Sequence, residues 1–153
     1  MATLKLLRRL VPSERGAELI EFALVLPMLL LLVLGIVDFG FIFQRLEVVT
    51  NAAREGARIA VLPSYSAYDI RLRVNNYLTQ GGVPVSPGNP VINVYDVPVA
   101  LGPGATIVDA YQVQVTYLHS YLFLGGLSRL FGGSFSTVPL KAVSTMRIEG
   151  GGS

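Results

Sequence analysis

The chain has 153 residues, of which 52% are apolar and only 14% are charged, against about 25% charged residues in ordinary soluble domains. This balance predicts a membrane-associated protein with room for one small domain outside the lipid. The net charge of only +2 gives no indication of a nucleic-acid-binding surface. The lack of cysteine excludes disulfides and thiolate metal sites.

The first predicted element is a long apolar run from Leu19 to Phe43. About 20 apolar residues span a bilayer as a helix, so the run predicts a membrane-spanning helix. A secretory signal peptide is the competing interpretation, but its apolar core is only about 7–15 residues long. The segment before the run carries four cations: Lys5, Arg8, Arg9 and Arg15. The positive-inside rule therefore predicts a cytoplasmic N-terminus and an exported C-terminal part.

Two carboxylates, Glu21 and Asp38, interrupt the run, and carboxylates are costly in lipid. Their spacing corresponds to about 25 Å along a helix, close to the hydrocarbon thickness of about 30 Å. Both can therefore lie near opposite membrane interfaces, and no further role is predicted for Asp38. Pro27 is expected to bend or loosen the helix locally.

The helix is expected to continue beyond the membrane as far as Leu62, since Pro63 is the first proline after Gln44. Glu55 and Arg58 are expected to pair on this part of the helix, three residues apart. A stripe of small residues recurs there at helical spacing: Ala53, Gly56, Ala57 and Ala60. Small side chains allow close approach of another backbone. The stripe predicts packing against the chain's own sheet, with a groove for a neighbouring subunit as the alternative.

The rest of the chain predicts a compact α+β head. A helix is expected over Tyr68–Thr79, capped by Ser66 or Asp69. Alternating apolar and polar residues then predict strands over Ala110–Leu118 and Val138–Ile148, and a further strand is expected over Val91–Val97. These elements would form an antiparallel sheet of about three strands resting on the long helix.

The connection over residues 120–135 is unusually apolar for a loop. Leu127–Phe131 is expected to form a short helical turn. One interpretation is a flap that closes the small core. The other is an adhesive surface for a partner subunit or for the membrane.

An enzymatic function finds little support in the residues. His119 is the only histidine, next to Ser120 and ten positions after Asp109. A lone histidine of this kind is usually structural, and a catalytic triad depends on geometry that a sequence does not show. The sequence has no phosphate-binding glycine loop and no metal-ligand cluster. No catalytic residue, cofactor, metal or small-molecule substrate is therefore predicted.

A family resemblance rests on residues 15–61, which read RGAELIEFALVLPMLLLLVLGIVDFG and, after a short gap, LEVVTNAAREGARIAV. This pattern resembles the TadE-like proteins, which are pseudopilins of the tight-adherence (Tad, Flp, type IVc) pilus system. The C-terminal part, a strand, an apolar glycine-rich loop and a strand, also resembles the end of TadE-like domains, less specifically.

The resemblance implies that a membrane aspartyl prepilin peptidase cuts after Gly16 and makes Ala17 the new N-terminus. It implies that Glu21 is the assembly glutamate, which pairs with a new terminal ammonium of its own chain or a neighbour. Phe22 stands where pilins often have tyrosine. The implied fold is pilin-like, a long N-terminal transmembrane helix continuing into a small α+β head. The implied segments are a leader (1–16), a long helix (17–62, membrane-spanning over 19–43), a head (63–149) and a tail (150–153).

The expected function is that of a minor pilin or pseudopilin of a Tad pilus, anchored in the inner membrane and supporting pilus assembly, adhesion and surface attachment. The implied partners are membrane lipid, other pilins and pseudopilins, Tad inner-membrane assembly proteins and the prepilin peptidase. One alternative is an uncleaved single-pass scaffold of a pilus or secretion complex. A membrane-tethered hydrolase using His119 ranks last.

Overall fold

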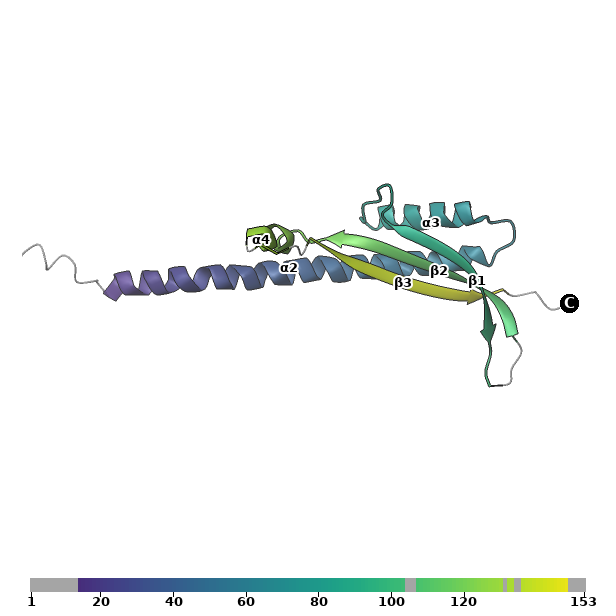
Figure 1. Ribbon diagram of the computed structural model, residues 1–153, viewed down its shortest axis with the longest axis horizontal. Helices are drawn as coiled ribbons and strands as arrows, with labels where there is room; N and C mark the ends of the chain where they lie inside the picture. The colour runs from purple at the N-terminus through teal and green to yellow at the C-terminus, as the bar shows by residue number, and fades with distance from the viewer. Residues whose placement is uncertain (1–13, 104–106, 131, 134–135, 149–153) are drawn as a thin grey trace, which may run out of the picture. The chain divides into compact units, whose positions relative to one another are not determined.

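The computed structural model describes residues 14–103, 107–130, 132–133 and 136–148. Most of the expected leader and the whole expected tail lie outside these residues. In chain order the elements are α2 (Glu14–Ala60), α3 (Ala67–Gln80), β1 (Val91–Ala100), β2 (Ile107–Ser120), α4 (Leu124–Leu130) and β3 (Thr137–Arg147) (Figure 1). A long apolar helix precedes a small head with an antiparallel sheet, so the predicted α+β class is confirmed.

The chain divides into two compact units, and the boundary between Val37 and Asp38 falls inside α2. The N-terminal unit contributes the more apolar half of α2, and the helix assignment runs through Pro27 without a break. The C-terminal unit contains the second half of α2, both other helices and the sheet. It is this unit that holds the hydrophobic core.

Local sequence explains both ends of α3. Ser66 is the N-cap, and its hydroxyl accepts a hydrogen bond from the Asp69 backbone N–H at 3.3 Å. The Asp69 carboxylate in turn accepts from the Ser66 backbone N–H at 2.9 Å, which completes a capping box. The two residues predicted as alternative caps therefore act together. Gly81 ends the helix.

The sheet has the order β1-β2-β3, and both pairings are antiparallel. The register aligns Ile92 of β1 with Val115 of β2, and Val115 with Ala142 of β3. These three side chains lie on one face of the sheet because residues directly opposite each other point the same way. That face is the buried one.

The core joins this sheet face to α2 and α3. The helices contribute Val49, Ala52, Ala53, Ala57, Ile59, Ala60, Ile70, Val74 and Leu78, and the strands contribute Ile92, Val113, Val115, Tyr117, Leu140 and Ala142. The period-2 alternation read along β2 matches the burial of Val113, Val115 and Tyr117. No side chain of residues 120–129 belongs to this cluster. This part of the apolar connection therefore lies outside the main core.

Candidate functional site

The described residues contain one helix that is long and apolar enough to cross a membrane, and the candidate range within it is Gly16–Ala60. None of the most apolar window of this helix is buried. Large side chains such as Leu24 and Met28 are about three-quarters exposed, at 74% and 76%. A helix that is apolar around its whole circumference and has no protein cover is the form suited to lipid.

Four predicted site residues lie at the start of this helix. Gly16, Ala17, Glu21 and Phe22 all belong to α2, so the Gly16–Ala17 bond is in helical conformation. Glu21 and Phe22 are exposed. Ala17 and Glu21 are four residues apart, which places them on the same face one turn apart. Glu21 makes no side-chain hydrogen bond or ion pair with the described part of the chain.

The small-residue stripe lies at the other end of α2. Ala53, Ala57 and Ala60 are at most 5% exposed, and Gly56 is buried with them. A Cβ atom added at Gly56 would lie 2.7 Å from Cγ2 of Val74 on α3 and 3.1 Å from Cγ1 of Val113 on β2. The backbone of α2 thus approaches both neighbours at a distance that only glycine permits.

Asp38 has a structural role that sequence reasoning did not predict. It is completely buried, and its carboxylate accepts three backbone N–H groups at the start of α4. Leu122 N lies 2.9 Å from Oδ1, Leu124 N lies 2.7 Å from Oδ2, and Phe123 N lies 3.1–3.2 Å from both oxygens. A helix start leaves such N–H groups without intrahelical partners. Asp38 therefore caps α4 from another element.

His119 lies near this contact and is also buried, at 1% exposure. Arg45 Nη1 lies 2.6 Å from His119 Nδ1, and since arginine only donates, Nδ1 must be the acceptor. The proton is then on Nε2, which is buried and has no hydrogen-bond partner among the described residues. Burial, reinforced by the Arg45 charge and opposed by Asp38, lowers the His119 pKa below its ordinary value. His119 is therefore neutral at pH 7.

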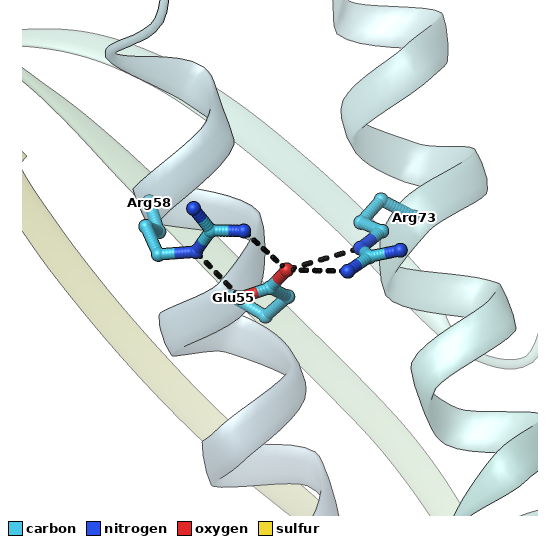
Figure 2. A network of polar contacts seen from close by, with 3 residues as sticks. All are labelled: Glu55, Arg58 and Arg73. Atoms are coloured by element: carbon cyan, nitrogen blue, oxygen red, sulfur yellow. Dashed lines mark hydrogen bonds and ion pairs between the residues drawn. The ribbon is translucent and has the colours of Figure 1, made fainter.

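A carboxylate links the two helices of the head, as Figure 2 shows. Glu55 of α2 accepts from Arg58 on the same helix at 2.8 and 2.9 Å and from Arg73 of α3 at 2.9 and 3.0 Å. The Glu55–Arg58 pair was predicted and is confirmed. The Arg73 contact joins positions far apart in sequence, so spacing alone gave no signal for it. Hydrogen bonds from Arg58, followed by those from Arg73, lower the Glu55 pKa to about 2 against the opposing effect of burial.

The structure does not bring together the residues of the conceivable triad. Asp109 and His119 are ten residues apart on β2, which at about 3.3 Å per residue is about 33 Å of strand. Ser120 points to the opposite face from its neighbour His119 because side chains alternate along a strand. The histidine ring instead contacts Arg45 and lies edge-on to Tyr121.

The family model for TadE-like protein matches residues 16–58. The match covers the whole apolar segment, Asp38, Arg45 and Glu55, and it ends within the small-residue stripe. No curated protein and no solved structure matches the chain. The interpretation of the chain beyond Arg58 therefore depends on the geometry of the structure alone.

The matched segment contains the N-terminal features of the resemblance, namely Gly16, Glu21, the apolar helix and the AAREGAR continuation, but not the C-terminal strand, loop and strand. The TadE-like family is associated with Tad pili as a structural rather than an enzymatic family. Residues 16–58 of this chain are thus similar to the TadE-like proteins.

Proposed function

We propose that this protein is a minor pilin or pseudopilin of a Tad pilus, matured by a prepilin peptidase that cuts after Gly16. The observation that carries the proposal is the position of Gly16 and Glu21 at the start of an uncovered apolar helix, inside the segment that matches the TadE-like family. A plain membrane anchor needs neither the glycine nor a carboxylate within its first turns.

The chemistry of assembly follows from the helix. Cleavage would create an ammonium at Ala17, one turn from Glu21 on the same face. In lipid, both charges are tolerated only when they are paired. The pair forms within the chain or between a Glu21 and the new terminus of a neighbouring subunit, and the second arrangement links subunits. The exposure of Glu21 leaves it accessible for either pairing.

The proposed topology places the leader in the cytoplasm and the head on the far side of the inner membrane. The cations before the run support it through the positive-inside rule. The proposed partners are other pilins and pseudopilins, Tad inner-membrane assembly proteins and the peptidase. In this role the protein would support pilus assembly, adhesion and surface attachment.

Cleavage is tested by the intact mass and N-terminal sequence of the protein purified from its native cells. We expect a chain that starts at Ala17 when the peptidase is present and at Met1 when its gene is deleted. Gly16→Leu should keep the full length in both strains. A mature protein that starts at Met1 in peptidase-positive cells would refute cleavage and favour the uncleaved scaffold.

The assembly role is tested with Glu21→Ala, with Glu18→Ala as the matched control on the same turn of the helix. We expect both variants to be inserted and cleaved, but only Glu21→Ala to fail to support piliation in electron micrographs. Normal pili in the Glu21→Ala strain would exclude the assembly role.

A further inference from the structure

The contact between Asp38 and α4 fixes a part of the head at the end of the apolar segment. From Leu19 to Val37 the helix rises about 28 Å, which nearly equals the hydrocarbon thickness of about 30 Å. We take the span to end at Val37 rather than at Phe43, because Asp38, the next residue, is completely buried in the folded head. Asp38 then lies at the outer membrane boundary once this segment is inserted. This step rests on the membrane insertion in the proposed function.

The hydrogen bonds of Asp38 then bring Leu122, Phe123 and Leu124 to the same boundary. Asp38 and these residues belong to the same compact unit, so the placement does not depend on how the two units are oriented. Leu122 is 61% exposed and Phe123 is 39% exposed. Two large, exposed apolar side chains thus lie at the depth of the membrane–water interface.

The composition of this segment fits an interfacial location. Between Ser120 and Phe135 the only charged side chain is Arg129, and there is no carboxylate. Arg129 lies in the last turn of α4 and is exposed. Apolar side chains on one side and a cation able to reach headgroup phosphates are the combination found in segments that lie in a membrane interface. Phe39 and Phe43 extend the apolar surface along α2 and are also exposed.

We propose that Leu122 and Phe123, which we call the interfacial edge, insert into the outer interfacial layer of the bilayer and hold the head against the membrane. The occupant of this surface is lipid rather than a partner protein, because Asp38 fixes the edge at the depth where the apolar segment ends, and Phe39 and Phe43, close to Asp38 on α2, are exposed apolar side chains as well. Arg129 contacts anionic headgroups beside it.

The absence of cysteine from the sequence permits a clean test. Single cysteines are introduced in the full chain at Leu122, Phe123, Met28 and Ile107, labelled with a nitroxide, and reconstituted in phosphatidylcholine–phosphatidylglycerol vesicles. Collision rates with oxygen, which concentrates in lipid, and with a water-soluble nickel chelate report depth. All four side chains are exposed, so the label disturbs no core. Met28 serves as the span control, and Ile107, 67% exposed on β2, as the head control.

We expect an oxygen-to-nickel ratio that is highest at position 28, intermediate at 122 and 123, and lowest at 107. A ratio at 122 and 123 as low as at 107, with position 28 in lipid, would overturn the interfacial edge while leaving the membrane span intact. Low collision rates with both reagents at 122 and 123 would also overturn it, since they indicate cover by protein. An aqueous ratio at position 28 would refute the span itself, and the interfacial edge with it.

Discussion

At the scale of single residues, Asp38 illustrates how a charge that is costly in an apolar run becomes useful. Its carboxylate accepts three N–H groups that would otherwise start α4 without partners. Hydrogen bonds to an ionised acceptor are each worth about 1.5–3 kcal/mol, and a buried donor left alone costs a similar amount. Asp38 therefore stabilises α4, which is too short to be stable without such an external partner.

We predict that Asp38→Asn weakens the start of α4, because an amide offers one oxygen where the carboxylate offers two. Amide hydrogen exchange at Leu122, Phe123 and Leu124 should accelerate by an amount equivalent to about 1–3 kcal/mol of local stability. Exchange at Val113 and Val115 in the sheet should not change. The control is Asp96→Asn, an exposed aspartate on β1. Unchanged exchange at all three amides would contradict the capping role.

Glu55 should make the stability of the head depend on pH in acid. Its pKa is about 2 in the folded protein against 4.5 ordinarily, so the folded state binds the proton less tightly than the unfolded chain. The stabilisation is complete above pH 4.5 and is lost as the pH falls from 4.5 towards 2. Since both arginines are half exposed, solvent screening reduces the contribution to about 1–2 kcal/mol.

The corresponding variant is Glu55→Gln, studied by denaturant unfolding at several pH values. We expect it to be less stable than the unmodified protein at pH 6, and we expect the difference to shrink as the pH falls from 4.5 towards 2, where the folded carboxylate also becomes protonated. Glu47→Gln, an exposed position on the same helix, should show neither effect. A stability difference that does not change with pH would count against the ion-pair explanation.

At the scale of elements, the agreement between sequence and structure depends on where the stabilising partners lie. The helix α3 was predicted within one residue at each end, because its cap and its stop, Ser66 and Gly81, are local. The turn expected at Leu127–Phe131 is instead the helix α4, which begins at Leu124. Its cap, Asp38, is distant in sequence, so no local pattern announces its start.

The strands show the same principle. Alternation identified β2 and β3, and a strand was also expected in the place of β1. The central residues of all three agree with the structure, but β1 extends to Ala100 and β2 begins already at Ile107. This extension is exposed at many positions, so it carries little alternation and is held by cross-strand backbone pairing. The Arg45–His119 and Arg73–Glu55 contacts were not predicted for a similar reason, since each joins elements whose relative position no periodicity gives.

The close approach of α2 to α3 and β2 leads to a prediction at this scale. Gly56→Val should destabilise the head by about 1–3 kcal/mol, because added carbon atoms would collide with Val74 and Val113 in a packed core. Thermal unfolding followed by circular dichroism measures the loss. The control is Gly126→Ala on α4, where an added Cβ meets nothing within 4 Å. Equal stability of Gly56→Val and the unmodified protein would show that the helices can separate to accommodate the side chain.

At the scale of the whole molecule, the chain combines two units with different requirements. Among the described residues, the N-terminal unit exposes most of its large apolar side chains, whereas the buried core side chains all belong to the C-terminal unit. The core begins at Val49, so its burial of apolar surface does not need the membrane segment. Asp38, which caps α4, is the first residue of the C-terminal unit and so belongs to the same unit as the hydrophobic core.

This division predicts the behaviour of two fragments, one of residues 38–153 and one of residues 46–153. Both should unfold cooperatively with similar midpoints, because both retain the core from Val49 onward. Only the longer fragment retains Asp38 and Arg45, so only it should protect the amides of Leu122, Phe123 and Leu124 from hydrogen exchange. Protection of these amides in the shorter fragment would mean that α4 is stabilised by its own sequence. Loss of cooperative unfolding in the longer fragment would mean that the head depends on the membrane segment, and that the two units form a single folding unit.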